Sequence, residues 1–346
     1  MSIIWDGSSS PLLARVGSTH GWLSSQTPHP AVSVPRFLDP FSLFAIAHAI
    51  RVACVYRGIA RAGGYDSQLG NLQAAIVPLV LILGGSTVSS VLLGLVPGWV
   101  VTPIPVATYG LIPLLAAKTG IVSLVLSIPS LPRESLFCLI DGFSRIMGMT
   151  TLGVDVVLSH PNQAVRNSPW AMVLVAFISG GGGGMLVPAF KLFGPSWGFT
   201  DTPAWVKNGL NIDVWSAGFI GYVYATLIDA HPFFRKPVAY LLTHLPALRG
   251  FFDVPKAYLT SPRHTVLLQP GEAKIFCSLL LASMLFTSRI VVPLLSRSSA
   301  AGSAAQQQKR KAVAGIKEAQ QQAVAASSTA VKGAAKTGSV RERKNQ

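Results

Sequence analysis

One feature limits the possible folds of this chain more than any other: residues 67–117 form a run of 51 residues without a charged side chain. A second uncharged run, at 167–190, is 24 residues long. A helix needs about 20 apolar residues to cross the hydrocarbon core of a bilayer, so the two runs have room for two or three crossings. Only 12% of the 346 residues are charged, against about 25% in an ordinary soluble domain. The sequence therefore predicts an integral membrane protein, and it argues against a disordered chain or a soluble enzyme.

Seven apolar segments are candidates for membrane-crossing helices. They lie at about 40–60, 71–96, 99–128, 133–158, 168–190, 212–230 and 272–294. The second and fifth segments each carry a glycine cluster near the middle, and each follows a segment with charges inside it. Two copies of a three-helix unit enter the bilayer from opposite sides, a plan common among transport proteins. We therefore expect an all-α, polytopic membrane protein with about seven transmembrane helices, arranged as two inverted three-helix repeats plus one extra helix.

Composition divides the chain into three parts. Residues 1–38 are rich in Ser, Pro and Gly and are expected to form a flexible lead. A transmembrane domain is expected at 39–295. It would contain repeats at about 40–128 and 133–230, a polar insertion at 231–270 and a last helix at about 272–294. Residues 296–346 are expected to form a basic, disordered tail.

The net charge of +15 is concentrated in that tail, because residues 297–346 hold ten Lys or Arg and two acids. No aromatic residue lies among these charges, so nucleic-acid bases would have no stacking platform. The pattern predicts a cytosolic segment beside anionic lipid and no nucleic-acid partner. With the tail cytosolic, seven spans place the N-terminus in the lumen. The basic residues of the 231–270 insertion count against this orientation.

The glycine clusters, with two serines after the first, are the first candidates for an ion path. Glycine disfavours a helix interior by about 1 kcal/mol relative to alanine, so five in a row are expected to loosen or break the fifth helix and to line a water-filled path. Close helix packing through small residues is the alternative. The candidates are Gly84, Gly85, Ser86, Ser89, Gly180, Gly181, Gly182, Gly183 and Gly184.

Charged side chains inside apolar segments are the second group of candidates. Asp141 and Arg145 are four residues apart, on one face of the fourth segment. Either they form an ion pair within the helix, or Asp141 sets a cation preference while Arg145 gates the path or binds a lipid headgroup. Arg289 is interpreted as an interfacial anchor. His48 is either a hydrogen-bonding link between helices or a titrating group.

Motifs of soluble enzymes are absent from the sequence. It contains no phosphate-binding loop, no serine-hydrolase elbow and no zinc-protease motif, and its histidines have no metal-ligand spacing. The three cysteines lie in apolar segments and are interpreted as small core residues. We expect no enzymatic activity, no cofactor and no metal site.

Several short segments, in order, resemble the trimeric intracellular cation channels. Ile46-Ala47-His48 is similar to an IAH segment of that family, and Gly84-Gly85-Ser86 with Ser89 resembles its glycine-rich second span. Trp170, the glycine run and Phe190 are similar to its fifth span. The segment at 286–290 resembles its seventh. The resemblance covers roughly residues 40–230 and 272–295.

The resemblance implies a homotrimer of the endoplasmic reticulum, sarcoplasmic reticulum or nuclear membrane, with one ion path in each protomer. It implies passage of monovalent cations, chiefly K⁺, which balances charge during calcium release or uptake. Two basic residues of the family that contact the pore and phosphoinositide are missing here, at Ile140 and Gly180. Arg145 and Arg289 are the candidates to bind anionic lipid in their place.

Two other classes of function fit parts of the sequence. A secondary transporter of a small solute would share the inverted repeats and broken helices. A non-conducting scaffold would depend mainly on the basic tail. A membrane-embedded enzyme ranks last, because no nucleophile lies at a spacing from His48 or Asp141 that is typical of a catalytic motif.

Overall fold

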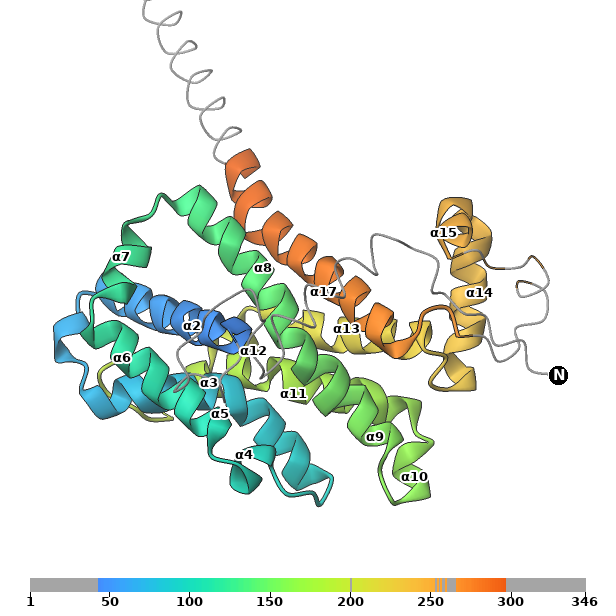
Figure 1. The fold of residues 1–346 in the computed structure, drawn as a ribbon, viewed down its shortest axis with the longest axis horizontal. Coiled ribbons are helices and arrows are strands. Elements are labelled where there is room, and N and C mark those ends of the chain that lie inside the picture. Colours follow the sequence, from blue (N-terminus) through green and yellow to red (C-terminus); the bar gives the residue numbers. More distant parts are fainter. Residues whose placement is uncertain are drawn as a thin grey trace, which may run out of the picture. The chain divides into compact units, whose positions relative to one another are not determined.

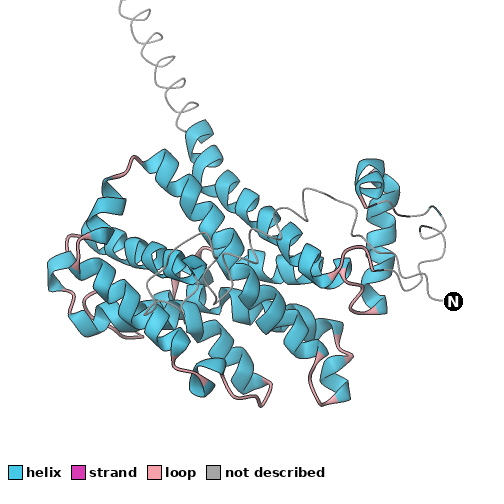
Figure 2. Ribbon diagram, in the orientation of Figure 1, coloured by secondary structure: helices cyan, strands magenta, loops and turns pink. Residues whose placement is uncertain are grey.

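The structure is a computed structural model, which describes residues 43–296 except residues 200, 253, 255, 257–258 and 260–265. The predicted lead at 1–38 and the tail beyond residue 296 lie outside the described residues. The chain divides into two units between Ile290 and Val291. Within the described part of the chain, every regular element is a helix (Figure 2).

Most of the helices belong to the first unit, and several are short pieces of longer segments (Figure 1). The α-helices are α2 (Leu43–Ala62), α3 (Asn71–Leu92), α4 (Gly98–Val101), α5 (Ile104–Val106), α6 (Ile112–Lys118), α7 (Ile121–Ser127), α8 (Ser130–Met149), α9 (Val156–Leu158), α10 (Gln163–Arg166), α11 (Pro169–Ala189), α12 (Ala204–Lys207), α13 (Ile212–Leu227), α14 (Arg235–His244), α15 (Pro246–Phe251) and α17 (Pro270–Phe286). Three π-helical segments extend or interrupt them: η3 (Ala107–Leu111), η4 (Thr150–Asp155) and η6 (Thr287–Val291). The 3₁₀ turns are η2 (Asp66–Gln68) and η5 (Pro232–Phe234).

Local sequence signals fix where the long helices begin. The Ser168 side chain accepts a hydrogen bond from the backbone N–H of Ala171 at the start of α11, and Pro169 occupies the first turn. Such polar caps satisfy backbone donors that have no partner within the helix. Helix α17 begins at a capping box, in which the Glu272 carboxylate accepts from the backbone N–H of Gln269 at 3.2 Å.

Three helices are long and apolar enough to cross a membrane: Asn71–Leu92, Pro169–Ala189 and Pro270–Ser296. The pair Ile104–Lys118 and Ile121–Ser127, bent by 74°, would make a fourth if it forms one broken span. These helices confirm that the chain has the character of a membrane protein. The count of seven spans and the inverted repeats stay predictions.

Two groups of helices form the first unit. The segments α2 to α7 lie together on the left of Figure 1, where α2 contacts α6 and α7. Helix α8 lies along α17, and α11 packs against α13. The two groups meet mainly where α3 crosses α11. The largest buried cluster of apolar side chains belongs to α8, α11, α13, α14 and α17 with their connections.

The glycine run of α11 lies inside an unbroken helix, so the expectation that it breaks this helix is wrong. A Cβ atom on Gly182 would lie 2.6 Å from the Cα atom of Gly85, which is closer than real Cβ atoms approach. The absence of side chains therefore lets the α3 and α11 backbones touch. This close contact offsets the low helix propensity of glycine, and backbone groups in lipid are satisfied only by intrahelical hydrogen bonds.

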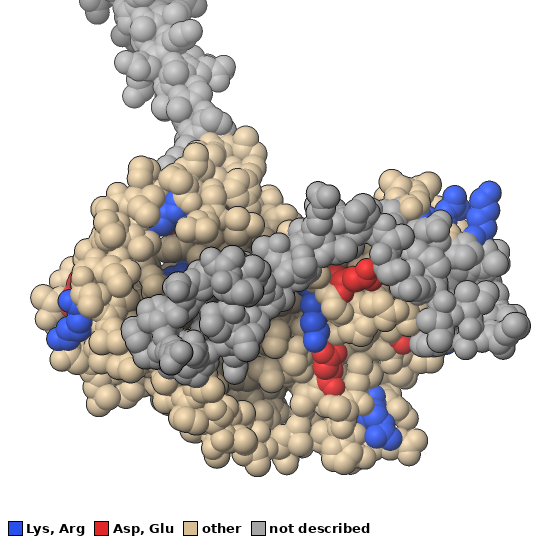
Figure 3. Space-filling model, viewed as in Figure 1, with Lys and Arg blue, Asp and Glu red and all other residues tan. Residues whose placement is uncertain are grey.

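The outer surface of the first unit carries many large apolar side chains. Leu72, Leu124 and Trp170 are each about 70% exposed, and the face drawn in Figure 3 has few charged side chains on its described part. Large apolar side chains exposed in such number are a cost in water, whereas lipid tails contact them without cost. The surface therefore agrees with the apolar helices in indicating a membrane environment.

Candidate functional site

A cavity of about 740 Å³, lined by charged as well as apolar side chains, lies within the first unit. Its wall is built from α2, α3, α8 and α11, with contributions from the start of α13 and from all three π-helical segments. Each π segment places one residue on this wall: Tyr109, Leu152 and Arg289. π-Bulges are rare and are frequently found at functional sites. The cavity is therefore the best candidate for a functional site in the described part of the chain.

Asp141 of α8 is the most deeply buried charge at this wall, with no exposed surface. Its Oδ2 atom lies 2.5 Å from Nη2 of Arg51, which belongs to α2, and 2.8 Å from Nη1 of Arg289. A carboxylate buried within a protein requires partners of this kind, because desolvation of an ion costs several kcal/mol. Asp141 thus ties together three segments that are distant in the sequence.

A second carboxylate, Asp213 in the first turn of α13, continues the network. Arg289 donates to its Oδ1 atom from Nη2 at 2.5 Å, and Arg145 donates to the same atom from Nη1 at 3.0 Å. Arg145 also donates to the Asp213 backbone carbonyl and, at 3.4 Å, to that of Gly180. Arg289 therefore bridges the two carboxylates with the two ends of its guanidinium group.

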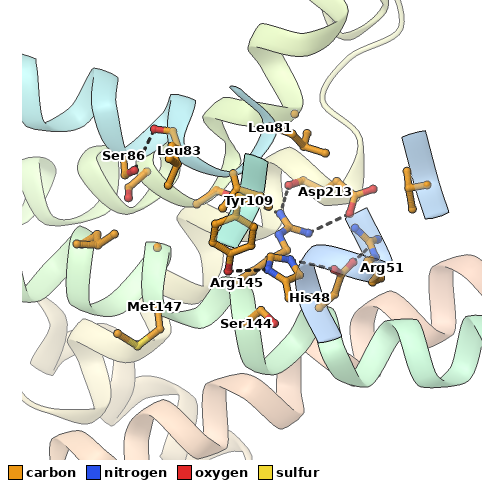
Figure 4. Close-up of a pocket in the computed structure, with 18 of the residues that line it drawn as sticks. His48, Arg51, Leu81, Leu83, Ser86, Tyr109, Ser144, Arg145, Met147 and Asp213 are labelled. Carbon is orange, nitrogen blue, oxygen red and sulfur yellow. Dashed lines mark hydrogen bonds and ion pairs between the residues drawn. The ribbon is translucent and has the colours of Figure 1, made fainter. Parts of the chain in front are cut away.

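His48 completes the charged wall from the α2 side. Its Nδ1 atom lies 3.2 Å from the Tyr109 hydroxyl, and the two rings are directed toward each other in Figure 4. Its Nε2 atom lies 3.8 Å from Oδ1 of Asp141, which is outside hydrogen-bond reach. Among the described atoms, Nε2 of His48, Oδ1 of Asp141 and Nε of Arg51 are buried without a hydrogen-bond partner. Buried polar atoms of this kind are uncommon, and here three of them belong to residues that line one cavity.

The network has an excess of positive charge. Three arginines (Arg51, Arg145 and Arg289) face two aspartates (Asp141 and Asp213), so its formal charge is +1. Glu134 also lines the cavity, but it pairs with Arg133 at 3.3 Å. In the arrangement that the structure describes, both aspartates are engaged by guanidinium groups.

The predicted glycine and serine candidates separate into two sets. Ser86, Gly180 and Gly184 lie on the cavity wall. The remaining candidates lie at helix contacts or within a helix: Gly84 faces Leu186, Gly85 and Gly182 face each other, Gly181 faces Val214, Gly183 faces Leu81, and the Ser89 hydroxyl donates to the Ser86 carbonyl. The packing interpretation therefore accounts for most of the glycines.

The structure rules out one of the two interpretations of Asp141 and Arg145 and changes that of Arg289. Asp141 and Arg145 do not form a pair within α8, although their spacing permits one, because each finds a partner on another helix. Arg289, interpreted from the sequence as an interfacial anchor, is bound to both aspartates at the cavity wall.

Three residues of the site were missing from the sequence-based candidates: Arg51, Tyr109 and Asp213. A signal for Arg51 was available, since an ionisable residue inside an apolar segment marks a candidate site by default. Asp213 lies at a helix start, where an acid is ordinary, and Tyr109 has no distinguishing pattern. No group of three His, Cys, Asp or Glu residues in the described ranges is arranged to hold a metal ion.

The family assignment receives no support from comparison with other proteins. No model of a known protein family matches the chain, and no curated protein or solved structure matches it either. The resemblance to the trimeric intracellular cation channels therefore depends on the short segments described above.

Proposed function

We propose that the protein is an ion channel of an intracellular membrane that conducts monovalent cations, chiefly K⁺. One observation carries the proposal: a fully buried carboxylate, Asp141, lies on the wall of a cavity that several charged side chains line, and one of its oxygens has no hydrogen-bond partner. Ionisable groups within membrane proteins are costly and typically mark ion or substrate paths. The Ser86 hydroxyl supplies a second oxygen on the same wall.

In this proposal, Arg289 acts as the gate. Its guanidinium group lies between Asp141 and Asp213 and neutralises part of the charge of each. With Arg289 in place the network has a formal charge of +1, which opposes cation entry. Withdrawal of Arg289 would leave two arginines and two aspartates, so the wall would become neutral and Asp141 would be open to a cation. Conduction is then passive, with oxygen atoms replacing part of the ion's hydration shell.

The finer architecture is part of the proposal. Two inverted three-helix repeats, at about 40–128 and 133–230, would place α2 opposite α8 and α3 opposite α11. Both pairs are in contact: Arg51 of α2 binds Asp141 of α8, and α3 touches α11 at the glycines. Contact between equivalent helices is expected close to a pseudo-two-fold axis, so these pairs support the inverted repeats.

The resemblance supplies the proposed biological setting. It places a homotrimer in the endoplasmic reticulum or nuclear membrane, with a lumenal N-terminus and cytosolic C-terminus, where K⁺ flow would balance calcium release or uptake. Anionic lipid, including phosphoinositide, is the proposed ligand of Arg145 and Arg289. Since both arginines bind Asp213 in the structure, lipid binding would compete with these ion pairs and so favour opening.

A secondary transporter is the second candidate. The observation in its favour is that Arg289 links η6 to α8 and α13 through pairs that could exchange during alternating access. A scaffold has less support, because the basic tail on which it would depend lies outside the described residues.

Currents from the purified protein in planar bilayers test the proposal. Under a KCl gradient, we expect single-channel steps with a reversal potential near that of K⁺. Asp141→Asn is expected to lower the K⁺ current and Arg289→Gln to raise the open probability. Asp66→Asn, which changes a carboxylate that is not a wall residue of the cavity, is the matched control.

Three outcomes would contradict this function. A reversal potential near that of Cl⁻ would show anion conduction, in keeping with the +1 network. Saturable, coupled flux without single-channel steps would favour the transporter. A folded protein that stays silent at all voltages and with anionic lipid present would exclude a channel.

A further inference from the structure

The connection between α13 and α17 begins and ends at one place. The backbone N–H groups of Leu267 and Leu268 both donate to the carbonyl of Leu227, at 2.9 and 3.1 Å. Leu227 is the last residue of α13, and the apolar helix Pro270–Ser296 begins just after Leu268. The connection therefore leaves the helix bundle and returns to it at the point where a helix apolar enough to cross a membrane starts. If this helix spans the membrane, its start marks a bilayer boundary.

Helix α14 lies in this connection with one face fixed against the bundle. Val238, Ala239 and Leu242 are buried and belong to the largest apolar cluster of the unit. Phe234, in the preceding turn, is buried with them. These contacts determine which side of α14 points outward.

The outward side of α14 has an apolar edge and a polar edge. Leu241 and Leu245 are one helical turn apart and are 46% and 45% exposed. Lys236 and Thr243, two turns apart, form the opposite edge and are exposed. Tyr240 lies between the edges and is 69% exposed. A helix with an apolar edge, an exposed tyrosine and a lysine is typical of the boundary between lipid tails and headgroups.

Charge favours an anionic lipid surface over a second copy of this chain as the occupant. The sequence from 228 to 269 contains five Lys or Arg and two Asp. In Figure 3, blue side chains project at the upper right, over the region of α14 and α15. Two copies of the chain meeting through this net positive segment would repel each other, whereas anionic headgroups would be attracted.

We propose that α14 is an interfacial helix that lies on a bilayer surface containing anionic lipid. The edge formed by Leu241 and Leu245 faces the acyl chains, Tyr240 lies at headgroup level, and Lys236 binds lipid phosphate or carboxylate groups. The exposed Phe233, just before the helix, adds a second aromatic anchor. This role is independent of ion conduction, so α14 could serve it in a channel or a transporter.

Spin labels on the full-length protein in liposomes test this placement. Leu241→Cys and Thr243→Cys put a nitroxide on the apolar edge and on the polar edge. The three native cysteines are buried, so unmodified protein serves as the labelling control. In vesicles of phosphatidylcholine with phosphatidylglycerol, we expect the ratio of collisions with oxygen to collisions with a water-soluble nickel complex to be several-fold higher at 241 than at 243.

The lipid requirement is tested with the same labels. Lys236→Glu, or vesicles of phosphatidylcholine alone, is expected to reduce the difference between the two positions, whereas Lys236→Arg is expected to retain it. Equal collision ratios at 241 and 243 would overturn the interfacial placement. Shielding of both labels from both reagents would show that protein covers α14 and would also overturn it. A difference that persists unchanged without anionic lipid would refute the charge argument.

Discussion

Replacement of Asp141 by asparagine is the sharpest test of the network at the cavity. The Asp141 carboxylate is fully buried and accepts contacts at 2.5 and 2.8 Å from two guanidinium groups. The substitution keeps the size of the side chain and removes its charge, so the network changes from a formal charge of +1 to +2. Arg51, with a side chain only 10% exposed, would then keep a buried charge without its partner. Removal of one partner from a buried ion pair costs about 3–5 kcal/mol, and we expect a loss of unfolding free energy in this range.

The assay is reversible unfolding of the purified protein in mixed micelles, followed by tryptophan fluorescence as the fraction of denaturing detergent rises. Asp66→Asn is the matched control. Asp66 is the first residue of η2, just after α2, where it pairs with Arg57 and Arg61, and its side chain is 28% exposed. Exposed pairs contribute about 0.2–1 kcal/mol, so Asp66→Asn is expected to be much milder than Asp141→Asn.

A double variant tests whether the uncompensated positive charge causes the loss of stability. Asp141→Asn combined with Arg289→Gln returns the network to a formal charge of +1, so the double variant is expected to be more stable than Asp141→Asn alone. The reasoning would be refuted if Asp141→Asn cost no more than Asp66→Asn, or if adding Arg289→Gln caused a further loss.

Two further predictions concern the contact of α3 with α11 at Gly182 and the ion pairs of Asp66 after α2. Gly182→Ala places a methyl group against the α3 backbone and is expected to lower the unfolding free energy by about 1–3 kcal/mol through overpacking. The control is Gly98→Ala, whose added methyl group meets nothing within 4 Å, and it is expected to change the unfolding free energy by less than about 0.5 kcal/mol. Equal effects of the two substitutions in the same micelle assay would contradict the close contact. Burial alone would raise the pKa of Asp66, but hydrogen bonds and charge from Arg57 and Arg61 hold it below the ordinary value of 3.8. The resulting stabilisation is fully present above pH 3.8 and is lost as the pH falls through the lowered pKa. The difference in unfolding free energy between wild type and Asp66→Asn should therefore shrink only at acid pH. A difference that shrinks near neutral pH would show that the Asp66 carboxylate is not its cause.

The sequence was informative about the helices because hydropathy acts locally. The uncharged run at 67–117 contains the apolar helix α3 and nearly all of Ile104–Lys118, the first half of the bent pair. The other uncharged run contains α11, with its start marked by Ser168 and Pro169. No distant contact is needed to decide that such segments avoid water.

The glycine run shows where local reasoning failed. Helix propensity predicts a break in α11, but the intact helix gains a contact with α3 that only glycine permits. Propensity describes an isolated helix in water, and it does not include the contact of two backbones at Gly85 and Gly182.

What the sequence by itself determined is the membrane character of the chain, the positions of its long apolar helices and the presence of costly charges within them, because each follows from a few neighbouring residues. Only the tertiary structure decided which charges meet. Asp141 binds Arg289, 148 residues away, and not Arg145 one turn along its own helix. The physical reason is that a buried charge is stabilised by whichever opposite charge the fold brings within about 3 Å, and that distance is set by how helices pack, not by how residues are spaced along one helix.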